Sequence, residues 1–364
     1  MKLKEIISVL ENVAPSSLQE EYDNAGLLTG NDQMEITGAL ICLDSTEQVI
    51  DEAIQRKCNL VIAHHPIIFS GLKKINGKNY IERIIIKAIK HDIAIYAIHT
   101  NLDNVYAGVN KKICEKLGLI NLRILAPSKG KLKKLVTFIP ISHLESVRAA
   151  VFQTGAGHIG NYEECCFVSP GEGTFKANEG SNPFRGSIGI RHHEQESRLE
   201  LIYESHQESA ILSALKASHP YEEVAYDCYA LTNSNQMIGS GMVGELPDSK
   251  PFEQFMFHLK STMLTNCIRH TKPISSQVKK IAVCGGSGSF LLPQAIASDA
   301  DVFVTSDFKY HQFFDADQRI VIADIGHYES EQFTGELLYD LLKEKFPTFA
   351  VRLTETNTNP VHYY

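Results

Sequence analysis

Residues 60–66 read Leu60-Val61-Ile62-Ala63-His64-His65-Pro66, four apolar residues that lead directly into two histidines. A short and wholly apolar run of this kind predicts a strand that is buried on both faces. Two similar runs flank it, and patterns with helical spacing separate the three; the runs are 39–44 and 93–98, and the helical patterns 46–54 and 80–91. This alternation predicts a parallel sheet covered by helices.

Residues 127–234 have a different rhythm, in which strand and helix patterns follow the order βαββαβ. That order is typical of a ferredoxin-like unit of roughly a hundred residues. The expected elements are 134–140, 142–154, 162–168, 198–205, 207–218 and 224–231. The Gly-rich stretch 171–185 predicts a loop. We also expect loops at His192-His193-Glu194 and at 219–223, where a second metal or effector site is an open alternative.

The strand and helix alternation resumes after residue 235, with strands expected at 279–284, 302–305 and 320–324 and a helix at 328–345. We therefore predict an α/β fold class, with two similar α/β lobes around a central metal site and an inserted ferredoxin-like domain. The expected boundaries are lobe 1 at 1–126, the insert at 127–234 and lobe 2 at 235–364. A chain of 364 residues is long for one hydrophobic core, which agrees with this division.

Composition excludes several classes of protein. Hydrophobic residues make up 43% of the chain and charged residues 21%, as in ordinary globular proteins. The net charge of −8, with no long basic run, disfavours nucleic-acid binding. No stretch of about 18 apolar residues is present, so we expect a cytoplasmic protein that does not associate with membranes. The eight cysteines form no CxxC pair, which argues against a zinc ribbon.

Polar residues gather where the expected strands end, which is where open α/β sheets bind their ligands. His64 and His65 end one strand, and Pro66 holds His65 in an extended conformation from which both imidazoles can reach two ions. A solvated pair of histidines is an equally good alternative for this segment alone. Asp103, just beyond the next strand, has a carboxylate that can bridge two cations, although a simple turn also explains it.

The start of the last helix supplies a second group of candidate ligands. His327 and Glu331 are four residues apart and therefore share one helix face. Asp307 and His311 repeat this spacing, and we interpret them as acid–base groups or as supports of the ligands; an ordinary surface ion pair explains them nearly as well. His99 is expected to orient a ligand rather than to bind metal.

Three imidazoles and two carboxylates favour Zn, Fe, Mn, Co or Ni over Ca or Mg. Five ligands are too many for one tetrahedral zinc and suit two divalent ions with positions left open. Two such ions would activate a bound water near neutral pH, which indicates hydrolysis. The run Gly285-Gly286-Ser287-Gly288 lacks the residues of a phosphate-binding loop, so a tight turn between strand and helix is favoured over an anion site.

Five motifs occur together and in order: Tyr22-Asp23-Asn24-Ala25-Gly26-Leu27, Ala63-His64-His65-Pro66, His99-Thr100-Asn101-Leu102-Asp103, Thr305-Ser306-Asp307 with His311, and Asp324-Ile325-Gly326-His327-Tyr328-Glu329-Ser330-Glu331. In combination they resemble the signatures of the Nif-three-like dinuclear metal-binding family. Bacterial members of that family often carry the name GTP cyclohydrolase 1 type 2 homologue. Two positions depart from the family pattern, because Tyr22 replaces a common Trp and Ser306 replaces the usual Gly.

The resemblance implies that two divalent metal ions per subunit are bound by five ligands: His64, His65, Asp103, His327 and Glu331. It also implies a homohexamer, a toroid whose metal sites face an internal cavity. The insert resembles the PII- or CutA-like module of longer members.

Two functions remain open from the sequence. The first is a metal-dependent hydrolase of a nucleotide-like or phosphorylated small molecule, with Asp307 or His311 moving the proton. The opening of the GTP purine ring is compatible with this chemistry, although no guanine-reading motif points to GTP. The alternative is a non-enzymatic metal-handling or regulatory scaffold.

Overall fold

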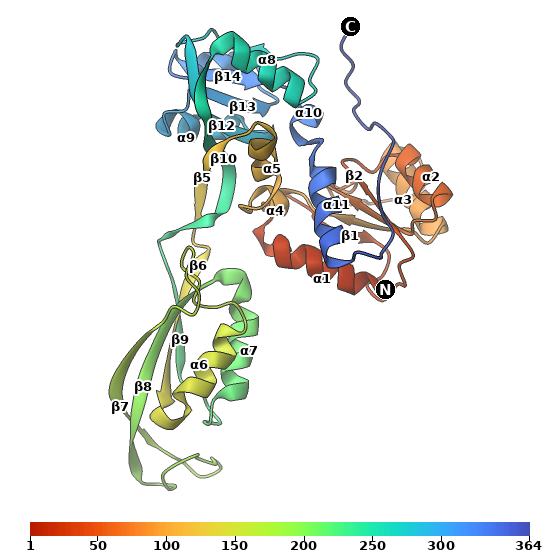
Figure 1. The fold of residues 1–364 in the computed structure, drawn as a ribbon. Helices are drawn as coiled ribbons and strands as arrows, with labels where there is room; N and C mark the ends of the chain where they lie inside the picture. The colour runs from red at the N-terminus through yellow and green to blue at the C-terminus, as the bar shows by residue number, and fades with distance from the viewer. The chain divides into compact units, whose positions relative to one another are not determined.

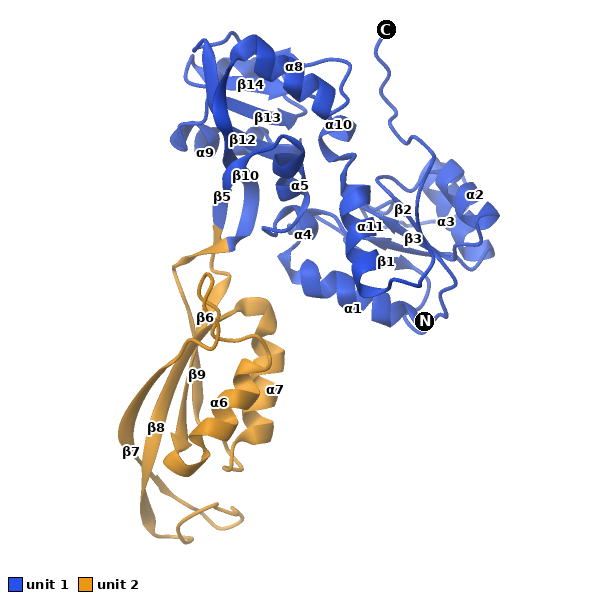
Figure 2. Ribbon diagram, viewed as in Figure 1, with its two compact units in different colours: residues 1–127, 237–364 blue, residues 128–236 orange.

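The computed structural model describes residues 1–364 and divides into two compact units. Unit 1 contains residues 1–127 and 237–364, and unit 2 contains residues 128–236 (Figure 2). The secondary structure of both units is mixed α/β, as the sequence predicts (Figure 1). None of the helices is long and apolar enough to cross a membrane.

The first sheet of unit 1 has the strand order β1-β4-β3-β2-β15. Its strands are β1 (Gly26–Thr29), β2 (Ala39–Cys42), β3 (Leu60–Ala63), β4 (Ala94–Ala97) and β15 (Val351–Leu353). Strands β2, β3 and β4 are parallel and buried along their whole length, because every residue in them is apolar or small. Helices α2 (Glu47–Gln55) and α3 (Tyr80–Lys90) pack into one core cluster of this sheet, and α1 (Leu3–Val13) packs into the other.

The second sheet of unit 1 has the order β11-β14-β13-β12-β10-β5. Its strands are β5 (Ile120–Lys129), β10 (Ser234–Pro251), β11 (Arg269–His270), β12 (Gln277–Ser287), β13 (Val302–Ser306) and β14 (Val321–Asp324). Strands β12, β13 and β14 are parallel, whereas β10 is antiparallel to β12. The remaining helices of unit 1 before residue 327 are α4 (Thr100–Asp103), α5 (Val109–Lys116), α8 (Phe252–Thr262) and α9 (Leu292–Ala297).

The single helix expected at 328–345 is wrong, because the structure has two helices there. Helix α10 spans His327–Glu331 and helix α11 spans Thr334–Lys345. Helix α10 packs against β12 and β13 of the second sheet, while α11 packs against β2 and β15 of the first sheet. One straight helix cannot lie on both sheets, so the break between them lets the chain pass from one to the other.

Unit 2 has the predicted βαββαβ order: β6 (Leu132–Pro140), α6 (Leu144–Phe152), β7 (Phe167–Lys176), β8 (Arg191–Glu204), α7 (Glu208–Ser218) and β9 (Tyr226–Ala230). The sheet order is β7-β8-β6-β9, and all of its pairs are antiparallel, as in a ferredoxin-like fold. Short 3₁₀ helices complete the two units, at Ser16–Leu18, Ile141–His143, Ser205–Gln207, Ser289–Leu291 and Tyr310–Ala316.

Three predictions in unit 2 are wrong. The strand expected at 162–168 lies at 167–176 instead, and it therefore takes up part of the expected loop 171–185. His192 to Glu194 belong to β8 rather than to a loop. The glycines there indicated a turn, but the β7–β8 ladder pairs Gly173 with Glu194 in regular register. A strand tolerates glycine where a neighbouring group approaches its backbone closely.

Candidate metal centre

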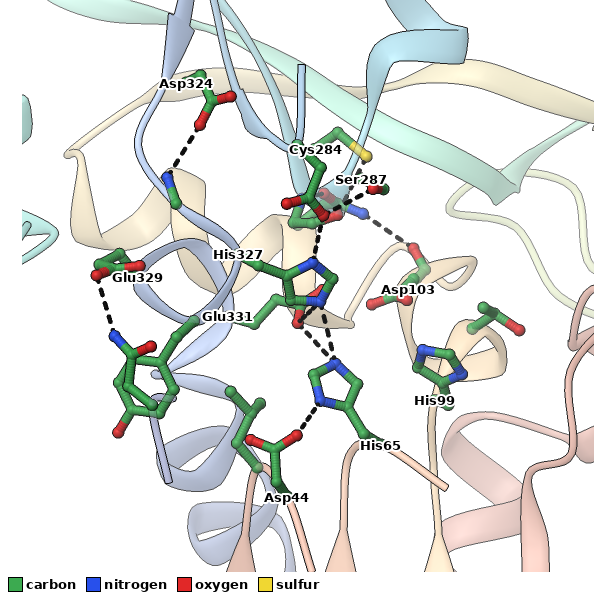
Figure 3. A pocket seen from close by; sticks show the side chains of 18 of the residues that line it. Asp44, His65, His99, Asp103, Cys284, Ser287, Asp324, His327, Glu329 and Glu331 are labelled. Atoms are coloured by element: carbon green, nitrogen blue, oxygen red, sulfur yellow. Dashed lines mark hydrogen bonds and ion pairs between the residues drawn. The ribbon is translucent and has the colours of Figure 1, made fainter. Parts of the chain in front are cut away.

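The candidate centre lies in unit 1, beyond the carboxyl ends of parallel strands from both sheets. His64 and His65 follow β3, and His99 follows β4 of the first sheet. His327 begins α10, shortly after β14 of the second sheet. His65, His99 and His327 border a cavity of about 900 Å³ (Figure 3), whereas His64 is fully buried and is not among the lining residues. The strands of two sheets therefore deliver their polar ends to one space, as expected for open α/β sheets.

The backbone fixes the two adjacent histidines in place. The amide of His64 donates to Cys42 O at 3.2 Å and that of His65 donates to Leu43 O at 2.9 Å, so the chain continues the β2–β3 pairing. Their ring centroids are 4.9 Å apart and tilted by 45°. The end of the strand thus places two successive imidazoles side by side, and the second of them, His65, lines the cavity.

Each imidazole of this pair is anchored through Nδ1. Nδ1 of His64 lies 2.8 Å from Ile98 O, a carbonyl that can only accept, so Nδ1 is the donor; in a neutral imidazole this leaves the lone pair on Nε2. Nδ1 of His65 lies 2.8 Å from Asp44 Oδ1. Such anchors orient the second ring nitrogen of a metal-binding histidine.

The other two imidazoles follow the same rule. Nδ1 of His327 lies 2.6 Å from Asp307 Oδ2, and Nδ1 of His99 lies 2.7 Å from Asp23 Oδ1. Asp23 also accepts hydrogen bonds from the amide and the hydroxyl of Thr100. A protein group therefore lies within hydrogen-bond distance of Nδ1 in all four rings, and this fixes the direction of Nε2.

The Glu331 carboxylate is the point where the donor atoms converge. Its Oε2 lies 2.9 Å from His65 Nε2 and 3.1 Å from His327 Nε2, and its Oε1 lies 3.8 Å from His64 Nε2. Asp103 Oδ1 lies 3.7 Å from His64 Nε2. Three groups have the spacing of metal ligands: His65 with His327 and Glu331, His64 with Asp103 and Glu331, and His64 with His65 and His99. Glu331 belongs to two of these groups, whereas Asp103 belongs to only one.

Two buried atoms at this point have no hydrogen-bond partner, namely His64 Nε2 and Asp103 Oδ1. A buried polar atom left unpaired costs about 1–3 kcal/mol, so such atoms are rare without a purpose. Here a lone pair on nitrogen and a carboxylate oxygen face each other, and both are electron donors. A cation satisfies both atoms, so the cluster can hold a metal ion.

Electrostatics in the cluster reflect its surplus of carboxylates. Burial and the nearby Glu331 charge raise the pKa of Asp103 to about 8. Burial opposes ionisation of Glu331, but hydrogen bonds from the surrounding histidines outweigh it and hold its pKa well below the usual range. Burial would lower the pKa of His65 and His327, yet their carboxylate partners raise it to about 10 and about 11. The donor set thus attracts positive charge strongly.

The sequence matches the profile of the DUF34/NIF3 family (NGG1p interacting factor 3) over residues 1–360. The chain belongs to the DUF34/NIF3 family.

Relatives of this DUF34/NIF3 chain match it over nearly their full length. It is 41% identical over 360 residues to the "GTP cyclohydrolase 1 type 2 homolog" of Halalkalibacterium halodurans, covering 98% of this chain and 97% of that protein. The protein of the same name from Bacillus subtilis is 39% identical over 363 residues, with the same two coverages. The crystal structure of a Bacillus cereus protein related to NIF3 superposes with a TM-score of 0.87 at 39% identity, covering 100% of this chain and 99% of that one.

The two expected acid–base residues of this family member lie in different surroundings. Asp307 accepts a hydrogen bond from Ser287 Oγ at 2.7 Å in addition to its contact with His327, and both interactions hold its pKa below the usual value. His311 lies in the 3₁₀ helix Tyr310–Ala316, where its ring contacts Tyr310 and Phe314. His311 is not among the residues that line the cavity.

Sequence reasoning missed two residues of the centre, Asp44 and Asp23. Asp44 anchors His65, and Asp23 anchors His99. Asp44 follows β2 at the same edge of the sheet as His64, so the rule that located the histidines also applies to it. Asp23 lies in the first of the family motifs, but no strand precedes it, so topology alone gives no signal.

The glycine run of this DUF34/NIF3 protein is not a tight turn after β12, because Gly285, Gly286 and Ser287 continue the strand. Gly286 has a φ of +62°, and a Cβ there would lie 2.4 Å from Glu331 Oε1. The run therefore provides room for the Glu331 carboxylate. At the two positions that depart from the family pattern, Tyr22 lines the cavity and Ser306 is fully buried in β13.

Proposed function

We propose that this protein binds a pair of divalent metal ions through His64, His65, Asp103, His327 and Glu331 and acts as a metal-dependent hydrolase. The observation that carries the metal site is the arrangement of Glu331. One of its oxygens faces the His64 and Asp103 group, and the other faces the His65 and His327 group. A carboxylate in this position can bridge two ions.

Two divalent ions bound there would supply the positive charge that lowers the pKa of a water molecule and stabilises negative charge during hydrolysis. The protein itself contributes orientation. Ile98 O, Asp44 and Asp307 fix the three ligand imidazoles through Nδ1. His99 is fixed by Asp23 and lines the cavity, so its other ring nitrogen can hold the proton that the attacking water releases.

The cavity lining supports a nucleotide-like or phosphorylated small molecule as substrate. Aromatic side chains that can stack on a heterocycle border it: Tyr22, Phe69, Phe290, Tyr328 and Tyr363. Arg269 is the only Lys or Arg among the lining residues, and Asp324 and Phe308 O hold its guanidinium. A fixed guanidinium suits recognition of a phosphate. The name of the bacterial relatives points to the same substrate class.

The test begins with elemental analysis of untagged protein that has been purified without chelators. Protein reconstituted with Zn, Mn, Fe or Co is then assayed with GTP and a panel of nucleotides and phosphoesters, with His64→Ala as the control. We expect metal-dependent turnover that His64→Ala abolishes. A metal content near zero after reconstitution refutes the metal site. Bound metal without turnover of any compound favours the alternative, a non-enzymatic metal-handling or regulatory scaffold.

Arg269→Ala separates substrate recognition from metal binding. We expect KM for a phosphorylated substrate to rise about tenfold or more while the metal content stays unchanged, because Arg269 belongs to none of the metal-ligand groups. An unchanged KM would contradict the proposal that Arg269 recognises a phosphate group of the substrate.

We extend the proposal to the homohexamer that the family resemblance implies, and to the cytoplasmic location and the division into 1–126, 127–234 and 235–364 that the sequence patterns predict. Sedimentation velocity measures the assembly directly, and a monomer at micromolar concentration contradicts it.

A further inference from the structure

Unit 2 contains a cavity of about 810 Å³ of its own. Its walls come from β7, from the segment that follows this strand, and from the loop between α7 and β9, all within the orange unit of Figure 2. A cavity of this size is in the range of small-molecule sites. The groups with metal-ligand spacing all lie in unit 1, and none of their residues lines this cavity.

Three aromatic side chains that contact one another line this cavity. The Tyr221 ring centroid lies 6.2 Å from that of Phe175 and 6.3 Å from that of Phe184, and its plane is tilted by 61° and 50° to theirs. The faces of aromatic rings attract ammonium groups through the negative potential of their π systems. Phe184 already has such a contact, because the Arg185 guanidinium lies 5.6 Å from its ring centroid.

A nearly buried carboxylate lies beside these rings. Glu196 is 8% exposed, and its Oε1 accepts a hydrogen bond from the Tyr221 hydroxyl at 2.7 Å. Its Oε2 lies over Gly173, where a Cβ would be only 2.1 Å away. Gly171, which also has no side chain, is opposite Glu196 in the β7–β8 ladder. Strand β7 therefore lacks side chains where the carboxylate needs room, and a buried carboxylate needs a positive or donating partner.

The remaining charges around the cavity agree with a cationic ligand. Four carboxylates line it, those of Glu172, Glu196, Glu222 and Glu223, together with only two cations, Lys176 and Arg198. Arg198 is already paired with Glu200 at 3.0 Å. Glu172, Glu222 and Glu223 are exposed, so Glu196 is the one carboxylate of the four that is buried, and it is bonded to the aromatic Tyr221.

We propose that this cavity binds a small organic cation, with its ammonium group at the Glu196 carboxylate and its carbon skeleton against Phe175, Phe184 and Tyr221. The site is independent of the metal centre, because none of its residues is a proposed metal ligand.

Three matched probes test the charge requirement on the full-length chain: phenethylammonium, the neutral 2-phenylethanol and the anionic 3-phenylpropionate. Calorimetry and ligand-observed NMR should detect phenethylammonium with a Kd on the order of 1 mM or tighter, and the other two at least about tenfold more weakly. Equal binding of the alcohol or the acid overturns the proposal, and so does the absence of binding by the cation.

Two variants and one control locate the site. Glu196→Gln should weaken phenethylammonium binding by about tenfold or more, and Phe184→Ala by several-fold. Glu163→Gln removes an exposed carboxylate of unit 2 that does not line the cavity, and it should leave the affinity unchanged. Phe184 is 43% exposed, so its truncation decides the matter if Glu196→Gln impairs folding. Unchanged affinity in Phe184→Ala, or a loss in the control variant as large as in the others, refutes the site.

Discussion

Three imidazoles of the candidate metal centre are fixed through Nδ1 by a group that belongs to the protein, a carbonyl for His64 and carboxylates for His65 and His327. The ring orientation is thus set before any ion binds. An ion that enters such a site does not have to pay the rotamer entropy of its ligands, which favours tight binding. The two carboxylates of the centre differ in another respect, because Glu331 belongs to both carboxylate-containing groups and Asp103 to one.

That difference gives a prediction for metal content. Glu331→Gln removes a ligand from both groups, so we expect it to lose nearly all bound metal. Asp103→Asn leaves the group of His65, His327 and Glu331 intact and should retain about one ion per chain. Elemental analysis of the two variants, with circular dichroism to confirm folding, makes the comparison. Equal metal content in both variants contradicts a bridging Glu331.

Among single residues, the sequence predicts where the candidate metal ligands lie, but it does not predict the groups that hydrogen-bond their Nδ1 atoms. His64, His65 and Asp103 could be located because strand ends in a parallel sheet share one edge. The Asp23 contact with His99 joins residues 76 positions apart, and no periodic pattern reports a loop contact of that kind.

Strand β12 and α10 meet at Gly286, where the backbone is left-handed and a side chain would strike Glu331. We expect Gly286→Ala to destabilise the fold by about 1–3 kcal/mol through backbone strain and to weaken metal binding about tenfold by displacing the carboxylate. Gly71→Ala is the matched control, since a Cβ there meets nothing within 4 Å. Chemical denaturation and competitive metal titration measure the two effects. A Gly286→Ala protein that is as stable as the Gly71→Ala protein would show that the close approach is unimportant.

Asp23 joins the segment before β1 to the start of α4 through His99 and Thr100. Burial opposes its ionisation, but these hydrogen bonds outweigh it and lower the pKa of Asp23 to about 2. A lowered pKa stabilises the folded state above the unfolded-state pKa near 4, and this contribution is lost as the pH falls toward 2.

We therefore expect Asp23→Asn to lower the free energy of unfolding by about 1–2 kcal/mol at pH 7, after allowance for solvent screening. The difference in the free energy of unfolding between Asp23→Asn and the unsubstituted protein should become smaller as the pH falls from about 4 to about 2. Urea unfolding at several pH values measures it, with the exposed Asp32→Asn as the control. A difference that is independent of pH would assign the effect to packing instead.

At the scale of elements, the short buried strands were predictable, whereas the full extent of the long strands was not. Strands β2, β3 and β4 are continuous apolar runs, which have few alternatives. Strand β10 extends over 18 residues but contains glycines at 239, 241 and 244 and a proline at 247, residues that usually indicate turns. Its extended form depends on pairing with β12 and β5, partners that are remote in sequence.

Each of the two units of the molecule has a hydrophobic core of its own, and the core of unit 2 includes Leu135, Leu199 and Ile211. The chain leaves and re-enters unit 1 at neighbouring positions, because a Cβ on Gly239 would lie 2.8 Å from Pro127 Cα. Replacing residues 128–236 with a short Gly-Ser linker should therefore preserve the metal content per chain. Elemental analysis of the deletion variant tests this. A folded deletion variant without metal would show that unit 2 supports the centre.

Strand β15 closes one edge of the first sheet by pairing with β2, although more than 300 positions separate residues 351–353 from residues 39–41. A chain that emerges from the ribosome begins to fold from its N-terminal end. The β2 edge of the first sheet therefore stays unpaired until almost the whole polypeptide has been made. The ligand set also stays incomplete until then, because Glu331 is synthesised long after His64. Interrupted synthesis would thus release fragments that lack the complete ligand set and expose a strand edge, which marks them as substrates for proteolysis.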